Sequence, residues 1–379
     1  ITPSTSLAEA FERNCARYRV DPATGKKNYA IVQAEDEIAA IGVAIGAGWN
    51  GARAFTTTSG PGVSLMQEFF GLSYFAEVPV VVFDVQRGGP STGMPTRTQQ
   101  SDLLIAALAS HGDTKHALLI PDGPGEAFEF AASAFDFAER LQTLVFVMLD
   151  LDIGMNSHLT QPFRWDDSRA YDRGKVLTGE ELETLSEFGR YNDVDGDGVP
   201  YRTLPGAHPT LGAYFTRGTS RDRFARYTEE AGPYVDNMER LLRKFETARA
   251  LLPRPVLKHA TKPTRIGVIH YGSTAPAIDE AQTLLECDGL HVDTLRIRAF
   301  PLAPEVTGFV RDHDEVFVVE QNRDAQMRVL MTTDLGIAPA QLTSILHFSG
   351  MPITARFIVG EIAGRLRRPA SAQALERVS

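Results

Sequence analysis

The chain has 379 residues, 43% of them hydrophobic and 23% charged, which is typical of a folded protein with room for two domains. Its formal net charge of −10 argues against nucleic acid or an anionic membrane surface as the main partner. No apolar run reaches the length that spans a membrane, and no segment resembles a signal peptide.

The two cysteines, Cys15 and Cys287, are far apart in the sequence, and neither belongs to a CxxC pair. The chain alone is therefore not expected to bind an iron–sulfur cluster or a thiolate zinc ion. The scattered histidines show no spacing typical of metal ligands, so we predict no metal site. Two lone thiols also fit a reducing, cytoplasmic setting.

Apolar runs rich in Val, Ile and Phe alternate with helical patterns in the first 150 residues. This alternation predicts a doubly wound α/β domain over residues 1–152, with a mostly parallel sheet covered by helices on both faces. Ser6 to Glu9 reads as a capping box, and because a strand normally precedes such a helix, we expect the first strand upstream of residue 1. The predicted strands are Tyr29–Gln33, Ala52–Thr57, Val78–Asp84, His116–Ile120 and Thr143–Leu149; the predicted helices are Leu7–Tyr18, Asp36–Gly48, Val63–Phe75, Ser101–Ala109 and Gly125–Leu141.

The rest of the chain changes character twice. Residues 153–260 are polar and aromatic, and they are too long for a plain linker, so we expect them to wrap another domain or a partner, with one amphipathic helix over Tyr234–Leu251. Alternation resumes in residues 261–368, which predicts a second, smaller α/β domain, and the tail 369–379 has no clear pattern. The strands predicted there are Arg265–His270, His291–Arg296, Glu315–Glu320 and Leu342–Leu346, and the helices are Ala275–Glu286, Ala303–Asp312, Arg323–Thr333 and Ile353–Leu366.

Three consecutive acids, Glu35, Asp36 and Glu37, lead into the segment Ile38–Trp49, which has no charge on any face. Such a helix is expected to be packed on most sides. A carboxyl group at its mouth would then be half inside the protein, where it can share or move a proton. For Asp36 and Glu37 we favour a structural role, which is to complement the helix dipole. Glu35 is the candidate catalytic residue.

Loops that follow strands of a parallel sheet gather at the carboxyl edge, where ligands bind. Besides Gln33–Glu35, that edge should hold the turn Thr58–Gly62, which is Thr58, Ser59, Gly60, Pro61 and Gly62. Its glycines let the backbone come close to a ligand, and free N–H groups of Val63 and Ser64 would favour a polar or anionic group. Turns of this composition are also common without any ligand.

The predicted loop Val85–Gln100 contains two arginines, Arg87 and Arg97, among Gly, Pro, Ser and Thr. A guanidinium offers a planar fork that suits a carboxylate. The alternative is an arginine that ties the loop down through backbone carbonyls. Arg87 follows directly on a strand end, so we predict a functional role for it, whereas for Arg97 the two roles are balanced.

The stretch Asp193–Gly198 matches the first half of a calcium-binding EF-hand loop. The twelfth position is Leu204, where a bidentate Glu would be required, and Pro200 follows at once. We interpret the stretch, including Asp195 and Asp197, as an Asx-rich turn first and a cation site second.

Several of these motifs together resemble the α subunit of 2-oxoacid:ferredoxin oxidoreductases, most closely of the 2-oxoglutarate type. The likeness covers nearly the whole chain, and the loop around Arg87 is its most specific part. The segment Ile1–Ser4 resembles the end of a family loop that reads Tyr-Pro-Ile-Thr-Pro. The motifs are Gln33–Glu35, Thr57–Gly62, Val85–Gly93, Asp193–Arg202 and Val318–Arg323.

The resemblance implies a thiamine diphosphate enzyme in which this chain is the pyrimidine-binding half, followed by a domain like the C-terminal domain of transketolase. A separate β subunit would hold the cofactor's diphosphate, Mg²⁺ and a [4Fe-4S] cluster. Glu35 falls where the family has the Glu that hydrogen-bonds the aminopyrimidine ring, and Thr58–Gly62 falls beside the cofactor. Thr2 and Arg87 fall where the carboxylate of the 2-oxoacid is held, and Arg97 or Thr96 could contact a distal carboxylate.

The implied reaction is the reversible, coenzyme A-dependent oxidative decarboxylation of 2-oxoglutarate to succinyl-CoA, with electrons passing to ferredoxin. The implied assembly is (αβ)2, with a γ-type domain that helps bind coenzyme A, either fused upstream or present as a separate chain. Two alternatives stay open: the same chemistry on pyruvate or a branched-chain 2-oxoacid, and a non-catalytic α/β scaffold that only binds a partner.

Overall fold

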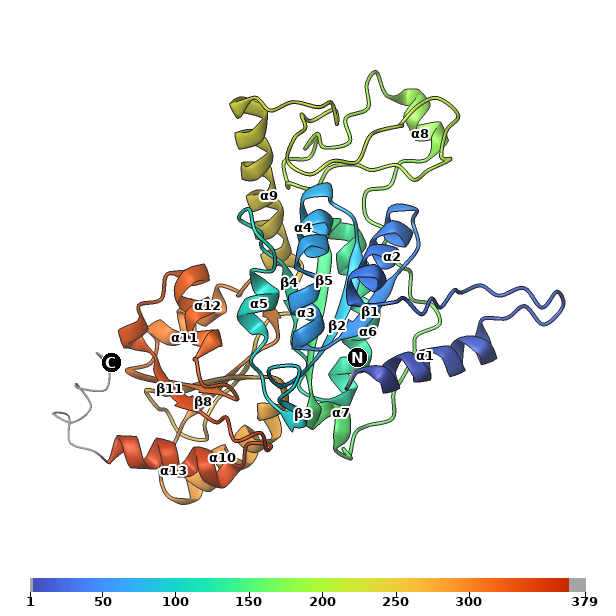
Figure 1. Cartoon of the computed structure of the whole chain (residues 1–379). Helices are drawn as coiled ribbons and strands as arrows, with labels where there is room; N and C mark the ends of the chain where they lie inside the picture. The colour runs from blue at the N-terminus through green and yellow to red at the C-terminus, as the bar shows by residue number, and fades with distance from the viewer. Residues whose placement is uncertain (1–2, 368–379) are drawn as a thin grey trace.

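The computed structural model describes residues 3–367, which fold around two sheets that lie side by side (Figure 1). The first sheet has the order β1-β2-β5-β4-β9, with β3 paired to β2. The pairs β1–β2, β2–β5 and β4–β5 are parallel, while β3 and β9 run antiparallel to their neighbours. Its strands are β1 (Phe55–Thr58), β2 (Val80–Gly88), β3 (Met94–Thr98), β4 (Ala117–Leu119), β5 (Leu144–Asp150) and β9 (Ala299–Phe300).

The second sheet has the order β11-β10-β7-β8-β6. Its strands are parallel except β6, which runs antiparallel to β8. The strands are β6 (Val256–Lys258), β7 (Ile266–Tyr271), β8 (Asp293–Ile297), β10 (Glu315–Glu320) and β11 (Thr343–Leu346), and the helices that accompany them are α10 (Ala275–Cys287), α11 (Glu305–Arg311), α12 (Gln326–Leu335) and α13 (Ala355–Leu366), with short 3-10 turns at Gly272–Thr274 and Pro339–Gln341.

Helices cover both faces of the first sheet because the side chains of its central strands are buried on both sides. Every residue of β2 is buried, as expected for a central parallel strand. One core joins Val80 and Val82 to Ile269 and Met327 of the second half, so the two sheets share apolar packing. The helices before residue 260 are α1 (Thr5–Tyr18), α2 (Glu37–Trp49), α3 (Gly60–Leu65), α4 (Gln67–Ala76), α5 (Leu103–Ala107), α6 (Pro124–Leu141), α7 (Leu151–Met155), α8 (Gly179–Thr184) and α9 (Ala231–Leu251).

The predicted fold class is confirmed, and all but one of the predicted strands have a counterpart in the structure. The exception is Tyr29–Gln33, which is irregular and exposed, with Ile31 and Val32 among the exposed apolar residues. A strand needs a neighbour to pair its backbone groups, and none of the described residues pairs with this segment. The predicted capping box is also wrong, because α1 begins at Thr5 with Ser4 before it.

Three strands were not foreseen: β3, β9 and the short edge strand β6. The expected loop Val85–Gln100 is instead a hairpin, in which β2 continues to Gly88 and pairs with β3. All residues of β3 except Thr98 are exposed, so backbone pairing holds this strand without an apolar pattern in the sequence. The short strand β9 comes from the second half of the chain and yet closes the edge of the first sheet on β4.

Helix α2 is less covered than its apolar sequence suggests. Ile41, Ala44 and Ile45 are buried, but Ile38 and Val43 are exposed at 41% and 47%. The expectation that this helix is packed on most sides is therefore wrong for the described chain. No helix within residues 3–367 is long and apolar enough to cross a membrane.

The middle of the chain is attached to the end of helix α4 through one buried carboxylate. Glu77, at the end of α4, has no exposed side-chain surface and binds Arg221 at 3.1 Å, Lys244 Nζ at 2.9 Å and the guanidinium of Arg240. Burial alone would raise the pKa of Glu77, but Arg240, Lys244 and Arg221 lower it below its usual value. The carboxylate therefore stays ionised and joins α9 and the loop around Arg221 to α4.

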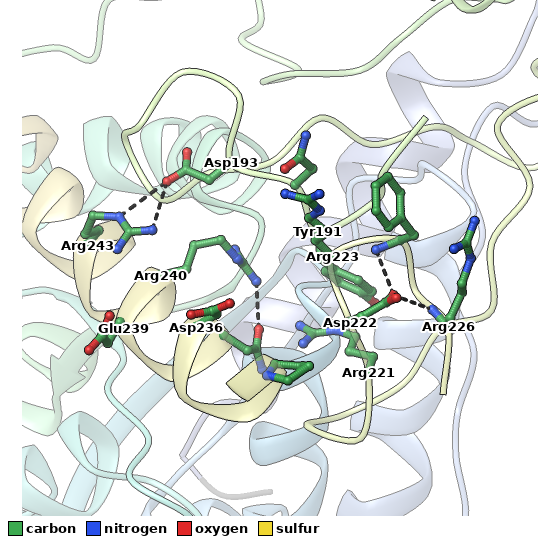
Figure 2. A pocket seen from close by; sticks show the side chains of 14 residues that line it. Tyr191, Asp193, Arg221, Asp222, Arg223, Arg226, Asp236, Glu239, Arg240 and Arg243 are labelled. Carbon is green, nitrogen blue, oxygen red and sulfur yellow. Dashed lines mark hydrogen bonds and ion pairs between the residues drawn. The ribbon is translucent and has the colours of Figure 1, made fainter. Parts of the chain in front are cut away.

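A hollow of about 540 Å³ lies beside this cluster, between α9 and the loop from Tyr191 to Arg226 (Figure 2). Several arginines line it, but their charges are largely matched. Arg221 and Arg240 bind Glu77, and Arg243 lies 3.3 Å from the Asp193 carboxylate. Asp222, Asp236 and Glu239 also line the hollow.

Replacement of Glu77 by Gln should lower the free energy of unfolding by roughly 3–5 kcal/mol, because it leaves buried cations without their counter-charge. Chemical denaturation of the variant measures this loss. The control is Glu68→Gln on the same helix, whose side chain is 84% exposed and which should change stability little. Equal stability of both variants would contradict the role assigned to Glu77.

Candidate functional site

The carboxyl ends of the central strands bring the predicted loops together. In register, Thr58 lies beside Asp84, and Gln86 lies beside Asp150. The turn after β1, the end of β2 and the start of α7 therefore share one edge, where β3 also lies, at the lower end of the first sheet in Figure 1. The expected meeting of the Ser59–Gly62 turn with Arg87 at this edge is confirmed.

The turn Ser59–Gly62 is tightly packed, which explains its glycines. A Cβ on Gly62 would stand 1.9 Å from Thr58 Oγ1, and a Cβ on Gly60 would stand 2.7 Å from Asp102 Oδ1. Helix α3 begins at Gly60, whose N–H donates to the Asp102 carboxyl group. Val63 N–H donates to Ser59 O at 3.0 Å, so the expectation that it is free for a ligand is wrong.

The three acids before α2 separate into different roles. Asp36 Oδ1 accepts the N–H of Ala39 at 2.7 Å, so Asp36 has the structural role predicted for it and acts as the N-cap of α2. Glu37 is half-buried, and its Cγ would lie 3.0 Å from a Cβ on Gly62, so the start of α2 packs beside the turn. Glu35 lies just before this helix and is exposed, contrary to the expected half-burial, because nothing within residues 3–367 covers it.

The two arginines of this region, Arg87 and Arg97, differ in burial and in hydrogen bonding. Arg87 is only 4% exposed, and its buried Nε has no hydrogen-bond partner among the described residues. This Nε–H is left to donate to another group, and a carboxylate is a suitable acceptor for it. Arg97 lies on the paired strand β3 next to Thr98, is exposed, and touches Thr96 O at 3.5 Å. Gly350, in the second half, lies beside the Arg97 side chain.

Two buried acids at this edge were missed in the sequence. Asp84 is fully buried, and burial, with Asp102 adding to it, raises the pKa of Asp84 well above its usual value. Burial also raises the pKa of Asp102 to about 7, although the Gly60 N–H and Arg87 act to lower it. Asp84 interrupts the apolar run of β2, and this interruption was the available signal.

Several of the unpartnered buried polar atoms lie at this edge. Among the described residues they include Ser59 Oγ, both carboxyl oxygens of Asp84, Arg87 Nε, Gln100 Oε1 and Asp102 Oδ2. Buried polar atoms normally have partners, so a cluster without them is typical of a site that completes its hydrogen bonds with a ligand or with water. Among them, Arg87 Nε–H and the Ser59 hydroxyl are donors that suit a carboxylate or another polar acceptor of a ligand.

The second half of the chain contributes to the same edge through a hydrogen-bond network. Gln100 Nε2 donates to Asp150 Oδ2 at 2.9 Å, and Ser273 Oγ donates to the same oxygen at 2.6 Å. Gln321 Nε2 donates to Ser273 Oγ at 3.0 Å, while Gln321 O accepts the Gln100 N–H at 2.8 Å. The segment Val318–Arg323, singled out from the sequence, thus lies against the candidate site.

Thr2 lies outside the described residues. The residues that follow it begin α1 beside the end of β1, where Thr57 Oγ1 is 3.5 Å from Ser4 O. The start of the chain therefore approaches the same edge of the sheet as the Ser59–Gly62 turn.

The Asp193–Gly198 stretch is a turn, as first interpreted. The Asp193 carboxylate accepts the N–H groups of Gly196 and Gly198 at 3.0 and 3.1 Å. The Lys175 ammonium lies 2.7 Å from both Asp195 and Asp197, where a cation would otherwise sit. Within residues 3–367 no group of three or more His, Cys, Asp or Glu side chains could hold a metal ion.

Comparison with known proteins gives a consistent result. The family model described as pyruvate flavodoxin/ferredoxin oxidoreductase, thiamine diP-bdg, matches residues 1–183. A 2-oxoglutarate synthase subunit KorA from Methanothermobacter thermautotrophicus is 33% identical over 351 residues, which cover 90% of this chain and 86% of the relative.

Other relatives are longer than this chain. The α subunit of 2-oxoacid:ferredoxin oxidoreductase 2 from Aeropyrum pernix is 33% identical over 97% of this chain, which spans 56% of the relative. A solved 2-oxoglutarate:ferredoxin oxidoreductase from Magnetococcus marinus, with 2-oxoglutarate, coenzyme A and succinyl-CoA bound, superposes with a TM-score of 0.84 at 25% identity. The superposition covers 96% of this chain and 60% of that one.

The buried acid Asp84 predicts a specific pH dependence of stability. A carboxyl group whose folded pKa is raised contributes its full stability below the unfolded pKa of about 3.9, and this contribution is lost as the pH rises toward the folded pKa. Asp84→Asn cannot ionise, so its free energy of unfolding should rise relative to the wild type between pH 5 and pH 8, by up to about 1.4 kcal/mol per pH unit.

Denaturant unfolding at several pH values measures this difference. The matched control is Asp167→Asn, at an exposed position, whose difference from the wild type should stay constant over the same range. A constant difference for Asp84→Asn as well would show that Asp84 is ionised in the folded protein.

Proposed function

The chain belongs to the α-subunit family of the 2-oxoacid:ferredoxin oxidoreductases, and from this premise we propose that it catalyses oxidative decarboxylation of 2-oxoglutarate together with a β subunit. The products are succinyl-CoA, CO2 and electrons for ferredoxin, and the reaction is reversible. One observation carries the proposal: a buried arginine, Arg87, has an unpartnered Nε at the carboxyl edge of the sheet, the edge that also holds the Ser59–Gly62 turn. That arrangement fits the carboxylate of a 2-oxoacid.

We propose thiamine diphosphate as the cofactor, shared between this chain and the β subunit. When bound, thiamine diphosphate supplies the electron sink that decarboxylation of a 2-oxoacid requires. The Thr58–Gly62 turn, with its unpartnered Ser59 Oγ, fits the polar aminopyrimidine end of that cofactor. As the family resemblance implies, we propose that the β subunit holds Mg²⁺, the cofactor's diphosphate and a [4Fe-4S] cluster.

Glu35 is proposed as the catalytic carboxyl group. It lies at the mouth of α2, whose first turn packs beside Gly62, so it is within reach of a ring that sits against the Ser59–Gly62 turn. Its role is to hold a proton against a ring nitrogen of the pyrimidine. Glu35 is exposed in this chain, and cover by the β subunit would remove it from water and strengthen that hydrogen bond.

Arg87 and Thr2 are proposed to hold the carboxylate next to the keto group. Burial makes the Arg87 guanidinium a stronger partner for this carboxylate than an exposed arginine would be. The exposed Arg97, with Thr96, is proposed to contact the distal carboxylate that distinguishes 2-oxoglutarate from pyruvate. Without that contact, pyruvate or a branched-chain 2-oxoacid becomes the preferred substrate.

For the assembly we propose (αβ)2 in the cytoplasm, with a γ-type domain, upstream or separate, that helps bind coenzyme A. Residues 1–152 would be the pyrimidine-binding unit, 153–260 the segment that wraps it, and 261–368 the unit like the C-terminal domain of transketolase. The exposed apolar residues of α2 next to Glu35, Ile38 and Val43, suit cover by the β subunit. The competing idea of a non-catalytic scaffold predicts the same assembly without a need for Glu35.

Glu35→Gln should abolish turnover of 2-oxoglutarate by the complete enzyme while the complex still assembles, because the amide cannot hold the proton at the ring. Reduction of ferredoxin and gel filtration measure the two properties. Glu12→Gln, an exposed acid on α1, is the control and should leave both unchanged. Full activity of Glu35→Gln would favour the scaffold.

Arg87→Ala should raise the KM for 2-oxoglutarate roughly tenfold or more, on the order of the loss of a charge-assisted pair.

Arg97→Ala should raise the KM for 2-oxoglutarate and leave that for pyruvate unchanged, because pyruvate has no distal carboxylate. Steady-state kinetics with both substrates separate the two arginines. A wild-type preference for pyruvate would overturn the choice of substrate.

A further inference from the structure

The hairpin that carries both arginines of the proposed site has an irregular second strand. Thr98 of β3 pairs with Arg87 of β2. Met94 pairs with Gly88, which is the next residue of β2, so the residues between Met94 and Thr98 have no partner opposite them and form a bulge. Arg97 is one of these residues. Strand pairing alone does not fix the direction of a side chain in such a bulge, so the position of Arg97 depends on another contact.

A turn from the second half of the chain makes this contact. The Thr98 N–H donates to Gly350 O at 3.2 Å. A Cβ on Gly350 would stand 3.1 Å from Arg97 Cβ and 3.1 Å from Met94 Cε, so the backbone of this glycine packs directly against both side chains. Gly350 also has a φ of +79°, which favours glycine. No larger residue fits at this position unless one of its neighbours moves.

The turn is itself held by the second sheet. His347 follows β11, and its N–H donates at 2.9 Å to the carbonyl of Glu320, the last residue of β10. Ser349 Oγ accepts the Met351 N–H at 3.3 Å and lies 3.2 Å from His347 Nε2. The second sheet therefore fixes the place from which Gly350 meets the hairpin.

The Arg97 guanidinium remains available to a ligand. Within residues 3–367 its hydrogen bonding is limited to Thr96 O, at 3.5 Å, and no acid of that part of the chain forms an ion pair with it. The stem of the side chain, in contrast, is close to Gly350, since Arg97 Cγ would lie 3.5 Å from a Cβ there. Arg97 also adjoins Thr98, the partner of Arg87, so the two arginines start from neighbouring positions of one hairpin.

We propose that Gly350 is a positioning residue that determines specificity, because it holds the Arg97 side chain in the place from which Arg97 contacts the distal carboxylate of 2-oxoglutarate. This inference rests on the proposed function and adds to it a role of the second half of the chain in the choice of substrate. Gly350 acts through Arg97 and does not itself contact the substrate.

Gly350→Ala tests this role because its Cβ crowds Arg97. Met94 Cε is the end of a flexible side chain and can move aside, whereas Arg97 Cβ is attached to the strand backbone, so the strand or the turn must shift by a few tenths of an ångström. A misplacement of about 1 Å can cost on the order of a hundredfold. The smaller shift should raise the KM for 2-oxoglutarate roughly three- to tenfold and leave the KM for pyruvate within about twofold of the wild-type value.

Two measurements on the complete enzyme check this expectation. Steady-state kinetics with 2-oxoglutarate and with pyruvate give the two KM values. Calorimetric titration with glutarate, a dicarboxylate that lacks the keto group, needs no turnover, and its Kd should rise by the same factor as the KM for 2-oxoglutarate. In the Arg97→Ala background, Gly350→Ala should cause no further rise, because the side chain through which Gly350 acts is gone.

Two further variants separate contact from backbone strain. Gly336, after α12, also has a positive φ, +67°, but no atom of the described residues beyond its chain neighbours lies within 4 Å of its Cβ position. Gly336→Ala is therefore the matched control and should leave both KM values unchanged. Gly350→Asn brings the same Cβ with a residue that tolerates a positive φ. It should raise the KM for 2-oxoglutarate as Gly350→Ala does.

Ser349→Ala keeps the proposal testable if both Gly350 variants fail to fold. Ser349 is exposed, and loss of its hydroxyl removes the bond to the Met351 N–H that holds the turn. This variant should raise the KM for 2-oxoglutarate about twofold or more and leave that for pyruvate unchanged, since a looser turn places Arg97 less precisely.

Four results would overturn the role of Gly350. They are wild-type KM values for 2-oxoglutarate in the Gly350 variants, an equal rise for pyruvate, a further rise on top of Arg97→Ala, and, where only Ser349→Ala folds, no change in that variant. Absence of turnover with every 2-oxoacid would instead overturn the proposed function, and titration with glutarate would still test Gly350.

Discussion

The complete burial of β2 is the constraint on which the rest of the structure depends. Its apolar residues, Val80 to Phe83, pack against the helices on both faces of the first sheet. The residues that follow, Asp84 to Arg87, are mostly polar and are still buried at the carboxyl edge. Polar side chains at such depth need partners. Gln86 finds them in Leu149 and Asp102, whereas Asp84 and Arg87 keep unpartnered atoms. Burial of β2 therefore stabilises the sheet and also leaves polar atoms at its carboxyl edge that a ligand can bind.

The second half of the chain stabilises this edge from the side. Gln321 and Ser273 extend hydrogen bonds from the second sheet to Gln100 and Asp150, and β9 pairs with β4. The shared apolar core makes this attachment extensive. The Gln100 network therefore links the second half of the chain to Asp150 at the end of β5. Hydrogen bonds of this kind let packing in the second half of the chain fix the positions of side chains at the candidate site.

The chain is exposed around the start of α2, which packs beside the Ser59–Gly62 turn. Glu35 and the apolar residues Ile38 and Val43 face water, although the sequence around them has the composition of an interior. A neutral helix with one open apolar side is typical of a surface that another polypeptide covers. This asymmetry supports the proposal that the site is completed by the β subunit, while Arg87 and the two buried acids are already in place.

Much of this could be derived from the sequence alone. The alternation of Val- and Ile-rich runs with helical patterns determined the α/β class, because local periodicity indicates strands and helices. The positions of the strand ends determined that Arg87 and the Ser59–Gly62 turn share an edge, because parallel strands end at the same edge of a sheet. Asp84 and Asp102, β3, β9 and the exposure of Glu35 were decided only by the tertiary structure. These features depend on which residues, far apart in the sequence, become neighbours in space. They are the burial of an acid, the pairing of a strand without an apolar pattern and the uncovered face of α2. Local sequence does not specify such neighbours.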